Sequence, residues 1–160
     1  EYAAALRALH GFHAAWEPAI WRTPGVAEAM DGGGRKLPLL NADLRALGIG
    51  PCEPPPHVHL DGTAQALGAL YVLEGATLGG RIIYRHVAGP LGVTPGNGAA
   101  YYHGYGDDTG ARWKAFGQAL TRFADEAGAD ARVVEGAVAC FAALQAYLCM
   151  PGVLDAPVSA

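Results

Sequence analysis

Apolar side chains recur every three or four residues along most of this chain, which is the spacing of an amphipathic α-helix. The first such stripe consists of Tyr2, Leu6, Leu9, His13, Trp16 and Ile20. Further helices are expected at about 39–47, at 110–127 and from residue 130 to a stop at 151–152. The residues expected on the inner face of the last helix are Val133, Val134, Ala137, Phe141, Leu144, Tyr147 and Leu148. No two neighbouring segments alternate in the manner of paired strands. The pattern therefore predicts an all-α fold of about five or six helices.

Proline and glycine mark the expected breaks between these helices. Pro18 is expected to kink or restart the first helix, and residues 22–36 have the glycine and proline density of a loop. The glycine-rich stretch at 31–35 lacks the preceding strand and the Gly-Lys-Ser/Thr ending of a phosphate-binding loop, so it is interpreted as a surface loop. Residues 51–56 are interpreted as a stiff, proline-rich connector.

One long helix of roughly six or seven turns is expected in the middle of the chain. It follows possible N-caps at Asp61 or Thr63, and the first stop signal after them is the pair Gly89-Pro90. The run between these points contains no proline, so a single uninterrupted helix is predicted.

Four glycines remove side chains from one side of this helix. Gly68, Gly75 and Gly79 are spaced so that they share a face, with Gly80 beside them. Together the four give up roughly 3 to 4 kcal/mol of helix propensity relative to alanine, so something must approach the bare backbone closely. Either a second helix packs there or a large flat ligand lies against it. Tyr71, one turn before Gly75, favours the ligand because its phenol could bond a polar edge.

Three segments carry a recognisable family pattern. They are the glycine-rich run at 70–80, the pair Tyr102-His103-Gly104-Tyr105-Gly106 and Arg112-Trp113-x2-Phe116, and the opening Tyr2-x3-Leu6-Arg7-x2-His10-x2-His13. They resemble the bacterial haem oxygenases, in particular the type found beside bacteriophytochromes, over nearly the whole chain. In that family the glycine-rich helix lies over one face of haem and leaves room for dioxygen, while an upstream histidine binds the iron from the other face. The resemblance implies a haem-oxygenase-like helical bundle.

The resemblance also implies a reaction, which is oxidative cleavage of haem to biliverdin, carbon monoxide and ferrous iron. Haem would be both substrate and cofactor, dioxygen would be consumed, and a ferredoxin or a reductase would donate electrons. A bacteriophytochrome that uses the biliverdin is a further expected partner. The alternative is a non-catalytic haem-binding or partner-binding module with the same fold.

The expected site residues fall into two groups. Those expected around the dioxygen pocket are Gly75, Thr77, Gly79 and Gly80. Those expected to contact haem or its propionates are Tyr71, Arg81, His103 and Lys114. In the first group, any side chain at Gly75 or Gly79 would occupy space that dioxygen needs. In the second group, the tyrosine is the preferred propionate contact.

Two polar positions in the glycine-rich helix carry open alternatives. The eukaryotic branch of the resembled family has an aspartate where this chain has Ala76, so proton delivery would run through Thr77, backbone carbonyls and water. Thr77 has the alternative of a hydrogen bond to its own helical turn. Glu74 has mostly apolar neighbours and needs a partner, with Arg81 and Arg7 as candidates. We favour a structural role for this carboxylate over a role as proton donor.

The histidines of the chain do not match the family's iron ligand. His13 lies on the apolar stripe with His10 one turn earlier, and a histidine on such a face is usually a hydrogen-bonded core residue. His57 and His59 alternate in the proline-rich linker, and two histidines alone are a weak metal signal. The helical pattern begins at residue 1 without an N-cap, so an upstream segment carrying the iron-binding histidine is expected. No metal ligand is assigned within the chain.

Composition limits the remaining possibilities. With 160 residues, 51% of them hydrophobic and 16% charged, the chain can bury one core, so we expect one domain over 1–150 and a short tail over 151–160. A net charge of −4 without a Lys/Arg block argues against nucleic-acid binding. We expect no membrane span and no signal peptide. The three cysteines have no metal-ligand spacing, and their odd number argues against a complete set of disulfides. We therefore expect a reduced, cytoplasmic setting.

Overall fold

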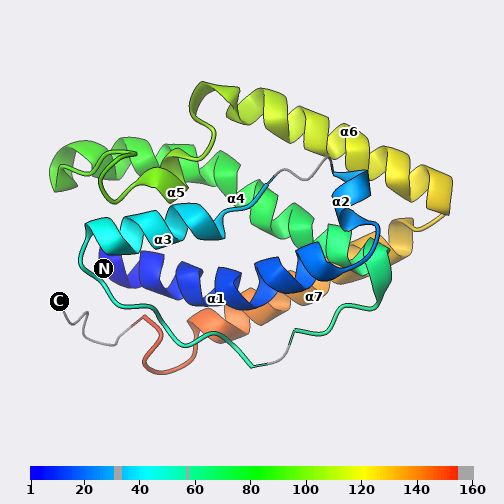
Figure 1. The fold of residues 1–160 in the computed structure, drawn as a ribbon, viewed down its shortest axis with the longest axis horizontal. Helices are drawn as coiled ribbons and strands as arrows, with labels where there is room; N and C mark the ends of the chain where they lie inside the picture. The colour runs from blue at the N-terminus through cyan, green and yellow to red at the C-terminus, as the bar shows by residue number, and fades with distance from the viewer. Residues whose placement is uncertain (31–33, 57, 155–160) are drawn as a thin grey trace.

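The computed structural model describes residues 1–30, 34–56 and 58–154. Over these residues it is built from helices, and the β-structure consists of isolated bridges at Thr94 (Figure 1). The elements in chain order are α1 (Tyr2–Arg22), α2 (Val26–Ala29), α3 (Leu37–Ala46), α4 (Gly62–Leu91), α5 (Ala100–His103), the 3₁₀ turn η1 (Gly106–Asp108), α6 (Thr109–Ala127) and α7 (Asp130–Leu148). The all-α prediction is confirmed. The described residues contain seven α-helices rather than five or six, because α2 and α5 have only four residues each and therefore no readable period.

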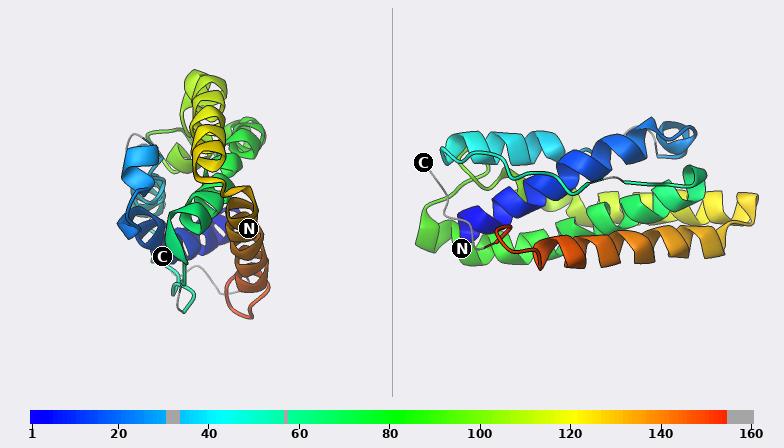
Figure 2. Two further views of the ribbon diagram at one scale, coloured as in Figure 1. Left: turned by 90° about the vertical axis from the view of Figure 1, so that its right-hand side faces the viewer. Right: turned by 90° about the horizontal axis from the view of Figure 1, so that it is seen from below.

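Helix α4 runs through the middle of the molecule and contacts most of the other elements. Its most extensive packing is against α7, and Figure 2 shows these two helices side by side along much of their length. Helices α1 and α3 cover another side, and α6 lies across α4 from the opposite direction (Figures 1 and 2). The main core joins α1, α4 and α7, and its largest fully buried members include Phe12, Ile20, Leu67 and Leu70.

Two prolines that were expected to interrupt or end helices lie inside them. Helix α1 continues through Pro18 to Arg22, so the predicted restart is wrong. Helix α4 continues past Gly89 to Leu91, and it is capped by Gly92, which has a left-handed φ of 65°. A proline deletes one backbone donor, and burial of the rest of the helix outweighs that loss, particularly in a terminal turn.

The expected caps and the tail also differ in detail. Thr63 donates its hydroxyl to the Pro24 carbonyl at 2.8 Å, and neither it nor Asp61 makes a side-chain cap for α4. Residues 51–56 are non-helical, as the connector prediction requires. Val153, in the expected tail, is buried against the main core, while residues 155–160 lie outside the described part.

The last helix turns only part of the predicted face inward. Val133 and Tyr147 are buried as expected, together with Gly136 and Cys140. Val134 and Phe141 were also expected on the inner face, but they are 60% and 56% exposed, as is Val138 at 62%.

By length and composition α4 and α7 are apolar enough to cross a membrane, contrary to the expectation of no such run. For α4 the apolar content is explained by its central position in the core, since core helices pass the same test.

Asp43 joins α3 to the start of α5. Its two carboxylate oxygens accept the backbone N–H groups of Ala100 and Tyr101 at 2.7 and 2.8 Å. These are two of the donors that the first turn of a helix leaves without an intrahelical partner. Burial raises the pKa of Asp43, and the two amide donors oppose that shift. The carboxylate therefore fixes α5, and with it the loop that follows, against α3.

Replacing this carboxylate should measurably destabilise the fold. We expect Asp43→Asn to lower the free energy of unfolding by about 2 kcal/mol, because an amide NH₂ would face a backbone N–H donor. Urea denaturation followed by circular dichroism measures the change. Asp107→Asn, at an exposed ion pair with Arg81, is the control and should leave the midpoint nearly unchanged. Equal midpoints for the two variants would contradict the prediction.

Candidate functional site

The glycines of α4 meet three different surroundings. A Cβ built on Gly68 would overlap the Val133 carbonyl oxygen and lie 2.7 Å from the Ala137 amide nitrogen. On α7, Gly136 meets the backbone of Gln65 in the same way. The helix-packing interpretation is therefore correct for Gly68. Gly80 contacts another element, because its Cβ would lie 3.1 Å from the Tyr102 carbonyl oxygen of α5.

The remaining two glycines lie on an open surface. A Cβ on Gly79 would meet nothing within 4 Å among the described residues, and one on Gly75 would meet only the edge of the Trp113 ring at 3.6 Å. Tyr71, Leu78 and Ile82 lie on the same side of the helix and are 41%, 42% and 54% exposed. We call these five residues of α4 the open strip. It is apolar, it lacks side chains at its centre, and among the described residues no backbone of another helix lies within 4 Å of a Cβ built at either glycine.

Tyr71 is the predicted site residue that lies one turn before Gly75 on the same side of α4. Its ring packs against the Trp113 ring of α6, with 5.3 Å between centroids. Trp113 in turn stacks on Phe116 at 5.7 Å. These aromatic rings form one edge of the open strip.

Thr77 points away from the strip. It is buried, its side chain lies near Gly104, and its hydroxyl donates to the Glu74 carbonyl at 2.6 Å. Of the two possibilities considered for Thr77, the structure therefore shows the hydrogen bond to its own helical turn. Together with the packing of Gly80 against α5, this takes two of the four residues expected around the dioxygen pocket out of the strip.

The other predicted contacts are dispersed. Arg81 pairs with Asp107 at 3.2 Å. His103 makes an edge-to-face contact with Tyr84, with centroids 5.3 Å apart. Lys114 is exposed beside a shallow depression whose lining residues all belong to α6. The structure does not bring these three residues together with Tyr71.

Histidines His10 and His13 are engaged within the protein. His13 is buried, with Nδ1 3.3 Å from a Glu17 carboxylate oxygen and Nε2 3.2 Å from the Tyr101 hydroxyl. Nε2 of His10 lies 2.9 Å from the Asn41 side-chain oxygen. Over the described ranges no group of three or more potential metal ligands is present. His57 lies outside the described residues.

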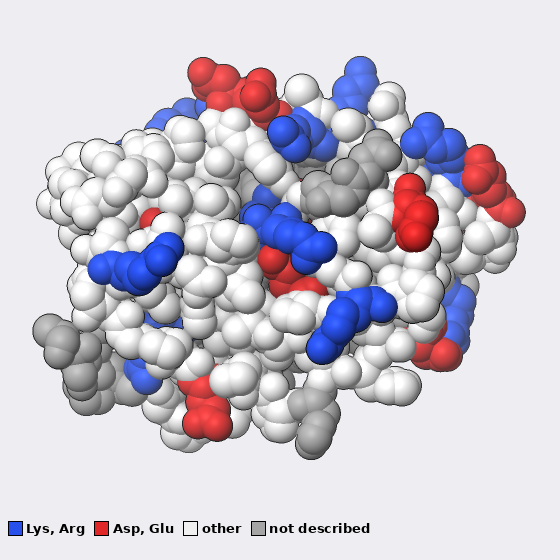
Figure 3. All heavy atoms as spheres, viewed as in Figure 1, with Lys and Arg blue, Asp and Glu red and all other residues white. Residues whose placement is uncertain are grey.

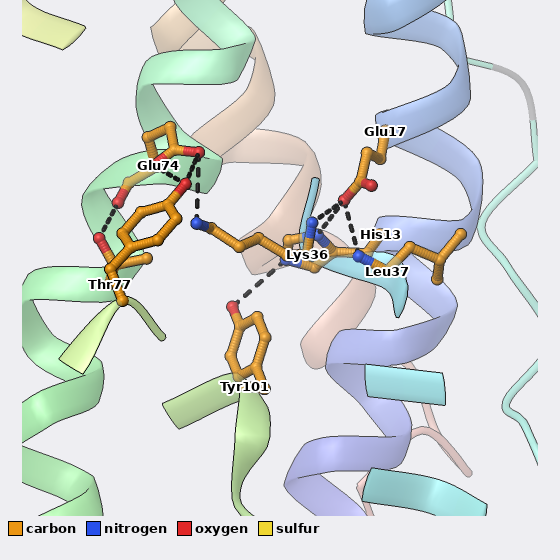
Figure 4. A network of polar contacts seen from close by, with 8 residues as sticks. His13, Glu17, Lys36, Leu37, Glu74, Thr77 and Tyr101 are labelled. Carbon is orange, nitrogen blue, oxygen red and sulfur yellow. Dashed lines mark hydrogen bonds and ion pairs between the residues drawn. The ribbon is translucent and has the colours of Figure 1, made fainter. Parts of the chain in front are cut away.

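A buried polar network lies between α4 and α1 (Figure 4). The Lys36 ammonium is 3.3 Å from a Glu74 carboxylate oxygen, and the Tyr105 hydroxyl donates to both oxygens of that carboxylate at 3.0 and 3.2 Å. The prediction that Arg81 or Arg7 would pair with Glu74 was wrong. Burial lowers the pKa of Lys36, and burial together with the Glu74 charge raises the pKa of Tyr105.

Sequence reasoning missed Lys36 and Tyr105 as members of this network. The one available signal was the need of Glu74 for a partner, and it did not identify which partner. Lys36 follows a glycine-rich stretch and so had the appearance of a surface residue. Basic and acidic side chains are interspersed on the face drawn in Figure 3, with no continuous basic surface there.

Comparisons with known proteins agree with this architecture. A family model described as "Heme oxygenase" matches residues 58–148, more than half of the chain. The "Heme oxygenase" of Xanthomonas campestris pv. campestris (strain 8004) is 37% identical over 111 residues, which are 68% of this chain and 64% of that protein. The chain thus spans less than two thirds of this relative's length.

A solved structure shares the fold. The NO- and CO-bound heme oxygenase from Neisseria meningitidis matches with a TM-score of 0.80 and 25% identity, covering 92% of this chain and 74% of that one. The helices, the glycine-rich α4 and the family match therefore lead to one conclusion. The chain belongs to the haem oxygenase family.

Proposed function

We propose that this chain forms the glycine-rich half of a site for oxidative haem cleavage, yielding biliverdin, carbon monoxide and ferrous iron. The observation that supports this proposal is the open strip, where a Cβ built on Gly79 would meet no described residue within 4 Å outside its own stretch of helix. Each glycine costs up to about 1 kcal/mol in a helix, and here no described helix packs closely enough to explain that loss. A flat ligand lying against the backbone explains it.

The residues of the strip fit a porphyrin. The backbone at Gly75 and Gly79 permits close approach, and Leu78 and Ile82 offer apolar contacts to the face of the ring. The Tyr71 phenol is a donor that suits a propionate at the polar edge. Bound haem would supply the iron at which dioxygen and electrons react.

The chain's own residues would hold the ring and restrict access to it. The aromatic edge at Trp113 limits how far the ring can shift along one side of the strip. Ala76 carries no acid, and the Thr77 hydroxyl is committed to a carbonyl of its own turn. Protons would therefore reach the strip through water rather than through a side chain of this helix.

The iron ligand and the partners are part of the same proposal. Both of the histidines on α1 are hydrogen-bonded to other residues of the chain. We therefore propose that the haem iron is bound by a histidine from an upstream segment. We further propose a ferredoxin or reductase as electron donor, a cytoplasmic setting, and a bacteriophytochrome as one user of the product.

Hemin titration of two forms of the protein tests the proposal. The chain of residues 1–160 and a form extended by its natural upstream residues are each titrated with hemin, then supplied with a reductase and dioxygen. A sharp Soret band and biliverdin formation in the extended form are the expected result. Absence of both in the extended form would overturn the proposal.

The occupied histidines favour one alternative, a haem-binding or partner-binding module that does not catalyse. A haem-binding module predicts a Soret band without biliverdin in the extended form, and a partner-binding module predicts neither. The same titration therefore separates the two functions.

A further inference from the structure

The open strip can face a ligand only if α4 is held at one rotation about its axis. On the strip side, glycine and exposed side chains give α4 few contacts that could fix this rotation. Glu74 lies about 100° around the helix from Gly75 and about 140° from Gly79, on the side of the strip that carries Leu78. Contacts to Glu74 therefore act on the flank of the turn that carries the strip.

Glu74 is held by two residues from other parts of the chain. The Lys36 and Glu74 side chains are 1% and 7% exposed, and the Lys36 ammonium also lies 3.6 Å from the centroid of the Tyr105 ring. Tyr105 precedes η1 and donates its hydroxyl to the same carboxylate. The charge of Glu74 is thus met from two directions, one from the segment before α3 and one from the segment before α6.

Lys36 is itself anchored at its other end. The backbone N–H groups of Lys36 and Leu37 donate to one Glu17 carboxylate oxygen of α1 at 2.8 and 2.9 Å. That oxygen also lies 3.3 Å from Nδ1 of His13. Lys36 therefore connects α1 to Glu74 on the flank of α4, as Figure 4 shows.

Packing alone does not hold the Glu74 side chain. A cavity of about 230 Å³ adjoins it, with Leu70, Tyr105 and Phe116 among the residues that line it. The carboxylate has room on that side, so its polar partners determine where it lies. A buried ion pair adds little net stability compared with apolar residues of similar size, so stability alone does not explain the charges.

We propose that Lys36, Glu74 and Tyr105 form a positioning cluster that fixes the rotation of α4 and so directs Gly75 and Gly79 toward the ligand. This inference rests on the proposed haem-cleaving function for its biological meaning. Its physical content, a turn of α4 held at one flank, can be measured without haem.

The decisive variant is Lys36→Met/Glu74→Gln. It removes both charges together, and the glutamine oxygen still accepts from Tyr105. In the apo chain we expect amide hydrogen exchange at residues 75–80 to become about tenfold faster, with the melting temperature nearly unchanged, because only the local anchor is lost. Arg132→Met/Asp61→Asn, which neutralises an exposed ion pair at the start of α4, is the matched control and should leave this exchange as in the wild type.

Two results would overturn the inference. One is wild-type exchange at residues 75–80 in the double variant. The other is a uniform acceleration along all of α4 with a lower melting temperature, which is what a merely structural pair predicts. Should the double variant fail to fold, Tyr105→Phe removes one hydroxyl only, and it should accelerate the same amides about threefold if the cluster positions the turn.

The haem-loaded, upstream-extended protein gives a second readout. The double variant should broaden the Soret band and spread the biliverdin over more isomers than the wild type produces. If the extended wild type binds no hemin, the proposed function fails while the exchange data still decide the role of the cluster. If the wild type reacts and the variant gives the same isomers and the same exchange, the positioning inference alone fails.

Discussion

Gly68→Ala is expected to lose about 3 kcal/mol of unfolding free energy, whereas Gly79→Ala is expected to gain about 0.5 to 1 kcal/mol. The two glycines lie on the same face of the same helix. A methyl group at Gly68 would meet the Val133 carbonyl and, at 2.7 Å, the Ala137 amide, and backbone atoms cannot rotate aside. At Gly79 the methyl group meets nothing within 4 Å, so only the better helix propensity of alanine remains.

Urea denaturation followed by circular dichroism measures both changes. Gly136→Ala provides an independent check, because its methyl group would overlap the Gln65 backbone across the same interface. It should therefore lose a similar amount. Loss of stability at Gly79, or none at Gly68, would show that α4 and α7 pack differently from the arrangement described above.

This pair of outcomes also shows what glycine spacing can and cannot predict. The spacing correctly placed Gly68, Gly75 and Gly79 on one face, because helical geometry alone determines that. It could not say what lies opposite each glycine. Gly68 is covered by α7, whose contact residues are more than 60 positions later in the chain, while Gly79 extends beyond that crossing.

Helix boundaries failed where a local rule met tertiary packing. Pro18 and Pro90 are strong local stop signals, yet the buried faces of α1 and α4 stabilise both helices through them. The short helices α2 and α5 were missed for another reason. Four residues span about one turn, so no hydrophobic period exists for them to show.

The face of the last helix could not be chosen from its pattern. Helix α7 has apolar residues almost all round, so Val134 and Phe141 fit an inner stripe as well as Val133 and Cys140 did. Because Gly136 is buried against α4, the face that carries Val133 and Cys140 is the one turned inward. A small residue at the centre of an apolar helix was the available signal for that contact.

The buried network was foreseeable only in part. Charge physics required a partner for Glu74, and the structure supplies Lys36 and Tyr105. Neither lies at a helical spacing from Glu74, since one precedes α3 and the other follows α5. Contacts between distant segments depend on the assembled fold, and no periodic signal in the sequence records them.

Gly79→Leu is expected to abolish hemin binding while leaving the fold intact. The leucine side chain would project from the centre of the open strip, where no described residue lies within 4 Å, and would occupy the space proposed for the macrocycle. Because it enters open space, the helix gains propensity and is not strained. In the upstream-extended protein, we expect the hemin dissociation constant to rise at least about 100-fold, measured from the Soret band, with an unchanged circular dichroism spectrum.

Gly117→Leu on α6 is the matched control. A Cβ there also meets nothing within 4 Å, and Gly117 borders the shallow depression on the outer surface of α6. The control adds the same apolar side chain to an exposed helix without touching the strip, so its hemin affinity should equal that of the wild type. If Gly79→Leu binds hemin as well as Gly117→Leu does, the ligand does not lie against α4, and the glycines at 75 and 79 need another explanation. If both variants lose binding, a general effect of surface leucine is responsible. Only selective loss at Gly79 supports a flat ligand on the open strip.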